Sequence, residues 1–290
     1  MSAVTDTAPP AAAPRAETVV VAGLPVHVLT AGTGAPLVYL HGAGDLGGWT
    51  PALDLLAADF RVVRPDHPGF NQSGDDPAIG SVAALSERYL EVFDALGLAE
   101  FDLIGTSLGG WLAAEIALRS PNRIRRLVLV DAAGLAPGSS SPNMFDVPAD
   151  ELVALTCGDA ASLAAGRQRD AAVRADAVLS ERRTRNTATT ARIAGDPYMH
   201  DPALPARLAG LRLPTLVVWG ELDGLFPVET ATSWTDLLPV ARAHVVAGAG
   251  HLPLVDRPAE FARVVAEFLS VDAPDDSPTG PGSAAGRVRR

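Results

Sequence analysis

Short apolar runs alternate along the chain with longer segments in which apolar residues recur every three or four positions. Short continuous runs are typical of strands buried on both faces, and the longer spacing is typical of helices that pack by one face. The predicted strands are residues 18–22, 26–30, 36–40, 60–65, 101–104, 124–131, 215–220 and 243–247. The predicted helices are residues 48–58, 79–96, 107–120 and 258–269. This alternation predicts an α/β fold with a mostly parallel sheet and helices on both faces.

The alternation stops over residues 133–209, where helical spacing is broken repeatedly by proline. We interpret this segment as a helical cap inserted between two strands and placed over the site. Its arginines are expected to form a solvated face with acidic neighbours, or one of them to bind an anionic substrate group. The core is then residues 17–132 and 210–271. Residues 1–16 and 272–290 are expected to be a disordered leader and a disordered tail.

Composition limits the kind of protein. Nearly half of the 290 residues are apolar, enough for one large core, and a net charge of −11 argues against a nucleic-acid surface. The single Cys157 offers neither an internal disulfide nor a redox pair, and Asp66-His67 lacks further metal ligands at suitable spacing. No signal-peptide pattern or membrane-spanning run is found. We expect a cytoplasmic protein without nucleic-acid or membrane partners. Its oligomeric state stays open, and a homo-oligomer is possible.

The segment Gly105-Thr106-Ser107-Leu108-Gly109 joins a predicted strand to a predicted helix and fits the G-x-S-x-G nucleophile elbow. A serine hydroxyl is a usable nucleophile only where a base and an electrophile both reach it, and a sharp, strained turn exposes it in this way. Gly105 and Gly109 lack side chains, so the strand and the helix can pass close together. Ser107 is therefore the candidate nucleophile, and the Leu108 amide is one donor for a developing oxyanion.

An oxyanion hole needs a second donor, which has to come from the loop after a neighbouring strand. His41-Gly42-Ala43-Gly44 follows the predicted strand 36–40, and its glycines allow the backbone to turn inward. We assign the second donor to the amide of Ala43. His41 is expected to brace this loop, because the histidine of a serine triad has to come from elsewhere.

Candidates for the acid and the base follow later strands. Asp223 lies just past the seventh predicted strand, where a carboxylate can orient a histidine and stabilise its imidazolium. Glu221, nearer to that strand, and Asp131, at the end of the sixth, are the alternatives for this role. His251 lies in a glycine-rich loop after the last strand and is the candidate base. The order of Ser107, Asp223 and His251, each after a strand, favours a catalytic triad.

Together these motifs resemble those of the capped α/β-hydrolases over residues 18–270. The matching segments are His41-Gly42, Asp66-His67-Pro68-Gly69-Phe70, Gly105 to Gly109, Gly220-Glu221-Leu222-Asp223 and Gly250-His251. The resemblance implies an eight-stranded sheet and no cofactor. It also implies Ser107 as nucleophile, His251 as base and Asp223 as the acid that orients it. Dehalogenase and epoxide-hydrolase members carry Asp at the nucleophile position, so Ser107 argues against both activities.

The cap length and the loops are also similar to those of the meta-cleavage-product C–C hydrolases. That group usually has a Trp directly after the catalytic histidine, where this chain has Leu252. We therefore expect a serine hydrolase that cleaves a small-molecule carboxylic ester through an acyl-enzyme. Two alternatives stay open: a C–C or lactone hydrolase with the same triad, and a ligand-binding protein of this fold without turnover.

Overall fold

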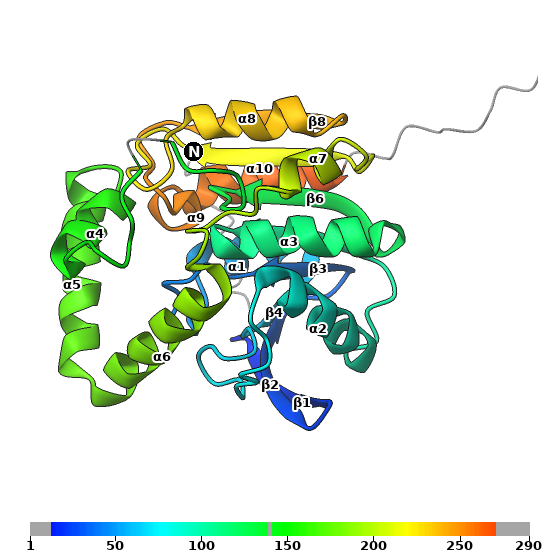
Figure 1. Ribbon diagram of the computed structural model, residues 1–290, viewed down its shortest axis with the longest axis horizontal. Coiled ribbons are helices and arrows are strands. Elements are labelled where there is room, and N and C mark those ends of the chain that lie inside the picture. The colour runs from blue at the N-terminus through cyan, green and yellow to red at the C-terminus, as the bar shows by residue number, and fades with distance from the viewer. Residues whose placement is uncertain (1–12, 139–140, 271–290) are drawn as a thin grey trace, which may run out of the picture.

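The computed structural model describes residues 13–138 and 141–270, which are built around one eight-stranded sheet (Figure 1). The strands are β1 (Arg15–Val21), β2 (Leu24–Ala31), β3 (Ala35–Leu40), β4 (Phe60–Pro65), β5 (Phe101–Thr106), β6 (Ile124–Val130), β7 (Thr215–Gly220) and β8 (Ala241–Val246). Their order across the sheet is β1-β2-β4-β3-β5-β6-β7-β8. β2 pairs antiparallel with both neighbours, and the other pairs are parallel. The predicted α/β class with a mostly parallel, eight-stranded sheet is confirmed.

Helices cover both faces of the sheet, so β5 and β7 are buried along their whole length. Val92, Leu112 and Trp234 lie in the core of one face, and Leu53 and Phe261 lie in the core of the other. The helices of the first face are α2 (Val82–Ala95), α3 (Leu108–Arg119) and α8 (Glu229–Leu237), and those of the second are α1 (Pro51–Leu56), α9 (Pro253–Asp256) and α10 (Pro258–Ser270). A short 3₁₀ helix, η1 (Pro121–Arg123), joins α3 to β6.

Between β6 and β7 the chain leaves the sheet as an insertion of helices. These are α4 (Ala149–Thr156), α5 (Ala160–Ala175), α6 (Ala177–Ala194) and α7 (Leu204–Leu208). In Figure 1, α4, α5 and α6 lie beside the sheet, on the left, and α7 lies near α3. Leu204 and Leu208 are fully buried and return the chain to the core before β7. None of the helices within the described residues is long and apolar enough to span a bilayer.

Several element boundaries differ from the sequence prediction, and two of the differences have a clear structural cause. β1 begins at Arg15, inside the predicted leader 1–16, because Arg15 and Ala16 pair with Thr30 and Leu29 of β2. Residues 1–12 of that leader and the predicted tail 272–290 lie outside the described residues. Helix α1 is shorter than the predicted 48–58, since Pro51 begins it and proline is favoured in the first turn of a helix.

Candidate active site

The residues singled out in the sequence follow the carboxyl ends of five strands. Ala43 lies after β3 and Ser107 directly after β5. Asp131 lies directly after β6, Asp223 after β7 and His251 after β8. In a parallel sheet these ends share one edge, which is where α/β proteins bind their ligands. The topology therefore gathers all five residues on one side of the sheet.

Ser107 stands on a sharp turn between β5 and α3, with φ 56° and ψ −119°. This left-handed backbone is uncommon for a residue with a side chain, and it agrees with the strain predicted for the elbow. The Ser107 N–H donates to the Val130 carbonyl at 2.8 Å, which fixes the turn to β6. A Cβ on Gly105 would lie 2.1 Å from the Gly109 carbonyl oxygen, so only glycine allows the helix to pass this close to the strand.

The loop after β3 packs against Ser107. A Cβ on Gly42 would lie 3.2 Å from the Ser107 Cβ, so the backbone next to Ala43 is in close contact with the serine. Within residues 13–138 and 141–270, neither the Ala43 N–H nor the Leu108 N–H donates a hydrogen bond. Neither amide is therefore committed to another acceptor in the described part of the chain, and the predicted oxyanion hole requires two such free donors.

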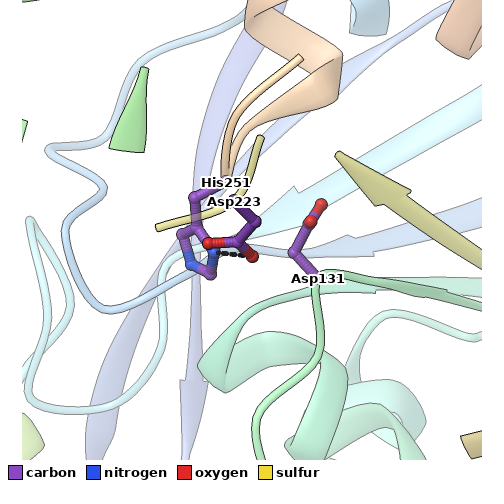
Figure 2. Close-up of side chains that lie close together, drawn as sticks. All are labelled: Asp131, Asp223 and His251. Carbon is purple, nitrogen blue, oxygen red and sulfur yellow. Dashed lines mark hydrogen bonds and ion pairs between the residues drawn. The ribbon is translucent and has the colours of Figure 1, made fainter. Parts of the chain in front are cut away.

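Asp223 and His251 form a buried pair. The His251 Nδ1–H donates to Asp223 Oδ2 at 2.8 Å, as Figure 2 shows. The other carboxylate oxygen, Oδ1, accepts the backbone N–H groups of Leu225 at 2.8 Å and Phe226 at 3.1 Å. The Asp223 carboxylate therefore has three donors, and it fixes the tautomer that leaves His251 Nε2 without a proton.

Ser107 and His251 share the carboxyl edge of the sheet and are both enclosed, with 6% and 4% of their surface exposed. Within the described residues, the Ser107 hydroxyl makes no hydrogen bond to the His251 ring. Such contacts are often long without substrate and shorten when one is bound. The structure thus pairs two of the three predicted triad members directly and brings the third to the same edge.

The two alternative acids lie in different settings. Glu221 is exposed, and its Oε2 accepts the Gly248 N–H at 2.8 Å, so it does not contact the His251 ring. Asp131 is fully buried beside the Asp223–His251 pair (Figure 2). Burial, together with the nearby Asp223 charge, raises the pKa of the Asp131 carboxyl well above its usual range. Asp223 is therefore the carboxyl group that bonds His251.

His41 braces its loop, as predicted, through contacts that the sequence did not indicate. Its ring stacks on His67 at 3.8 Å between centroids, and its Nε2 accepts the His67 backbone N–H at 3.1 Å. His67 in turn donates from Nε2 to the His41 carbonyl at 2.9 Å and accepts the Tyr89 hydroxyl at Nδ1. Burial and the nearby Arg64 charge lower the pKa of His41 to about 4. The pair is therefore neutral and structural.

The insertion reaches the loop that carries His251. The Thr156 carbonyl, at the end of α4, accepts the His251 backbone N–H at 3.1 Å. Asp256 Oδ2 accepts both the Gly158 N–H at 3.1 Å and the Gly250 N–H at 2.9 Å. These contacts join the α4–α5 turn to the histidine loop, and nothing in the sequence around residues 156–158 indicated them.

The arginines of the insertion follow the predicted pairing only in part. Arg174 and Arg183 both bind Asp170, which is the expected ionic face of α5 and α6. Arg182 and Arg185 instead donate to backbone carbonyls of the core, Arg182 to Leu46 at 2.6 Å and Arg185 to Asn71 at 2.6 Å. These two arginines therefore attach α6 to the loops that follow β3 and β4, rather than forming part of a solvated face.

The ligand atoms of Asp131, Asp223 and His251 lie within 4.8 Å of one another, close enough to surround a metal ion. A cation held by all three would displace the hydrogen bond between His251 Nδ1 and Asp223 Oδ2. Asp223 and His251 are therefore accounted for by their bond to each other rather than by metal ligation.

The sequence matches the family described as alpha/beta hydrolase fold over residues 35–258. A 2-hydroxymuconate semialdehyde hydrolase of Pseudomonas sp. (strain CF600) is 30% identical over 275 residues, which cover 87% of this chain and 93% of that protein. A pimeloyl-[acyl-carrier protein] methyl ester esterase of Yersinia pseudotuberculosis serotype O:1b (strain IP 31758) is 30% identical over 250 residues, which cover 80% and 92%.

A solved structure shares the fold. The 2-hydroxy-6-oxo-6-phenylhexa-2,4-dienoate hydrolase from Rhodococcus sp. strain RHA1 superposes with a TM-score of 0.75 at 24% identity, covering 89% of this chain and 99% of that one. The match to the family extends over most of the chain and includes the strands that carry Ser107 and Asp223. The chain therefore belongs to the α/β-hydrolase fold family and is a hydrolase of that family, as its sequence motifs predicted.

Proposed function

We propose that the protein is a serine hydrolase that cleaves a small-molecule carboxylic ester through an acyl-enzyme. The observation that carries this proposal is the buried Asp223–His251 hydrogen bond at the same sheet edge as Ser107 on its strained turn. Ser107 is the proposed nucleophile, His251 the base and Asp223 the acid that orients it. The esterase from Yersinia pseudotuberculosis, whose name gives a methyl ester as its substrate, supports the ester class.

The proposed reaction has two halves. His251 Nε2 removes the hydroxyl proton as Ser107 Oγ bonds to the ester carbonyl carbon, and the amides of Ala43 and Leu108 hold the resulting oxyanion. The carbon–oxygen bond to the leaving group then breaks, and His251 gives its proton to the departing alcohol. Water repeats the sequence on the acyl-enzyme and releases the acid. No cofactor or metal takes part in this scheme.

We further propose that the insertion is a cap over the site. The enclosure of Ser107 and the bond from Thr156 to the His251 loop support this role. A closed roof excludes bulk water and strengthens the hydrogen bonds to an oxyanion. The composition supports a cytoplasmic location and a small-molecule substrate, with neither nucleic acid nor membrane as partner.

A C–C bond or lactone hydrolase with the same triad is the second candidate. The relative named 2-hydroxymuconate semialdehyde hydrolase supports the C–C reaction, and Leu252 after the base argues against it. The two candidates separate in one comparison, in which a vinylogous diketone acid and p-nitrophenyl esters of increasing chain length are offered to the same enzyme. Faster cleavage of the diketone acid would favour the C–C reaction.

The serine assignment is tested by labelling with a fluorophosphonate probe, which reacts with activated serines. Ser107→Ala should lose both labelling and ester turnover, because it removes the atom that forms the acyl bond. Ser233→Ala changes an exposed serine of α8 and should keep both. A folded wild-type protein that neither labels nor turns over any ester would refute the proposal and favour a ligand-binding role.

A further inference from the structure

Asp131 is a buried carboxyl group for which the proposed reaction has no use. It follows β6 directly and has no exposed surface. Its Oδ1 accepts the Gly220 N–H at 2.8 Å, at the end of β7. Its Oδ2 is shielded from solvent and, within the described residues, no N–H or O–H group donates to it. A buried carboxylate oxygen without a donor carries a large desolvation cost.

A second carboxyl group lies next to it. Ligand atoms of Asp131, Asp223 and His251 all lie within 4.8 Å of one another, and Figure 2 shows Asp131 beside the pair. Two carboxylates buried this close repel each other, so one of them keeps its proton. Asp223 accepts three hydrogen bonds and Asp131 accepts one. Asp223, which has the larger number of hydrogen-bond donors, is therefore the member of the pair that holds the negative charge.

The surrounding charges act in the same direction. The ionisable groups that face Asp131 are Asp223 and His251, with Asp256 acting on it from α9. Both acids disfavour a negative charge on Asp131, and His251 is committed to Asp223. Burial and the Asp223 charge accordingly raise the pKa of Asp131 well above its usual range. A protonated Asp131 has a hydroxyl hydrogen to donate, and a carboxylate oxygen of Asp223 lies within 4.8 Å of one of its own.

We propose that Asp131 is a positioning residue whose protonated carboxyl donates a hydrogen bond from Oδ2 to the Asp223 carboxylate. This bond adds a fourth donor to Asp223 and withdraws negative charge from it, so it limits how strongly the Asp223 carboxylate attracts the His251 ring. The effect on catalysis rests on the proposed triad, whereas the protonation state of Asp131 does not.

Asparagine reproduces the protonated acid at this position. Its Oδ1 can accept the Gly220 N–H and its Nδ2 can donate to Asp223, while the left-handed backbone of Asp131, at φ 43°, suits Asn as well as Asp. Asp131→Asn should keep kcat/KM within about threefold, with the acid limb of its pH profile within about 0.3 units of the wild type. Asp131→Ala loses the donor, so it should lower kcat/KM by about tenfold or more and move the acid limb to higher pH.

The opposite state gives the opposite result. If Asp131 were ionised, Asp131→Asn would remove a negative charge beside His251, and the acid limb would move to lower pH by about half a unit or more. That shift would overturn the proposal. The expected pattern is that Asp131→Asn keeps the kcat/KM that Asp131→Ala loses, with no shift of the acid limb. A purely structural role for Asp131 would leave the acid limb of Asp131→Ala at its wild-type position.

Infrared spectroscopy tests the proton itself, without turnover. At pH 7 the wild type should show a carboxylic acid C=O band that moves on exchange into D₂O and is missing from Asp131→Asn. The matched control is Asp102→Asn, which removes a buried carboxylate that binds Arg125 at the other end of β5, and it should keep the band. A band that survives in Asp131→Asn would refute the protonated state. Failure of fluorophosphonate labelling with this band intact would instead reject the serine mechanism alone.

Discussion

Two buried histidines hold fixed tautomers: His41, in the loop that carries Ala43, and His67, whose ring stacks on it. His41 donates from Nδ1–H to the Gly42 carbonyl at 2.9 Å, and its Nε2 accepts the His67 backbone N–H. His67 uses Nε2–H on the His41 carbonyl, and its Nδ1 accepts the Tyr89 hydroxyl. A second proton on either ring would therefore break a hydrogen bond as well as charge a buried group. Both rings resist protonation in the folded protein.

The two histidines and Asp131 make opposite contributions to acid stability. In the unfolded chain both histidines bind a proton below about pH 6.5. In the folded protein burial lowers the pKa of His41 to about 4 and that of His67 well below its usual range, so both stay neutral to lower pH. Stability from the histidines is thus lost as the pH falls from 6.5 to 4. Asp131 has a raised pKa in the folded protein, so the folded state binds this proton at a higher pH than the unfolded chain does. Lowering the pH toward about 4 therefore increases the contribution of Asp131 to stability.

Asp131→Asn removes the contribution of Asp131, which stabilises the fold on acidification, and leaves that of His41 and His67, which destabilises it. Between pH 6.5 and 4.5 the free energy of unfolding of this variant should fall more steeply than that of the wild type, by up to about 1.4 kcal/mol per pH unit. Urea unfolding at several pH values measures both slopes. Equal slopes would mean that Asp131 titrates alike in the folded and unfolded chains.

At the scale of elements, the site depends on how closely α3 approaches β3. A Cβ on Gly109 would lie 2.2 Å from the Leu40 carbonyl oxygen and 2.5 Å from that of His41, and both atoms belong to the backbone. No rotation of a side chain relieves such a clash. The start of α3, which carries the Leu108 amide, can therefore lie against the end of β3 only because residue 109 is glycine.

Gly109→Ala should destabilise the protein by about 3 kcal/mol or more, because helix and strand have to separate to admit the methyl group. Gly80→Ala is the matched control: a Cβ there meets nothing within 4 Å, so the change should stay within about 0.5 kcal/mol. Thermal and urea unfolding of both variants gives the comparison. Similar losses in the two would show that the approach of α3 to β3 is adaptable.

Most of the sheet could be predicted from the sequence, because each central strand is a continuous apolar run between turn signals. The predicted strand 215–220 coincides with β7, and the predicted helix 258–269 ends one residue before α10 does. The edge position of Ser107, Asp223 and His251 followed from strand order alone. These features depend on local composition and on topology, both of which a sequence carries.

Other features depend on contacts between distant segments and could not be predicted. Helix α8 was missed because it is largely polar, and only its packing makes it a core element: Trp234 is fully buried and donates to the Ala132 carbonyl at 3.2 Å. Tyr89 lies within the predicted helix 79–96, and nothing in the sequence indicates its bond to His67. The sequence placed Asp131 near the site as an alternative acid, but its missing donor appears only in three dimensions.

At the scale of the whole molecule, the insertion and the sheet share a buried polar network. Asn186 of α6 accepts the Asn71 N–H at 2.9 Å and donates to the Asp45 carbonyl at 2.8 Å. The Asn71 side chain donates to Asp66 at 3.1 Å, and the fully buried Arg64 of β4 pairs with both Asp45 and Asp66. A continuous path of hydrogen bonds and ion pairs thus runs from α6 into the sheet.

Asn186→Ala should destabilise the protein by about 2 to 4 kcal/mol, because it leaves the buried Asn71 N–H and the half-buried Asp45 carbonyl without their partner. It should also speed hydrogen exchange along α6, where that attachment is lost. Thr184→Ala is the control, since Thr184 is exposed and its hydroxyl donates to the Ser180 carbonyl of the same helix. Exchange rates that change equally in both variants would mean that Asn186 is not an anchor.

The path from Asn186 to Arg64 also bears on how this enzyme can be engineered or can diverge. Exchanging the helical insertion for that of a relative is a common way to seek a new substrate range, and it treats the segment as a detachable module. Here the graft would leave the Asn71 N–H and the Asp45 carbonyl without their Asn186 partner, next to the ion pair between Asp45 and the buried Arg64. A functional chimera should therefore carry the loops around residues 45 and 71 together with the insertion, so these segments form one unit of inheritance although the chain separates them.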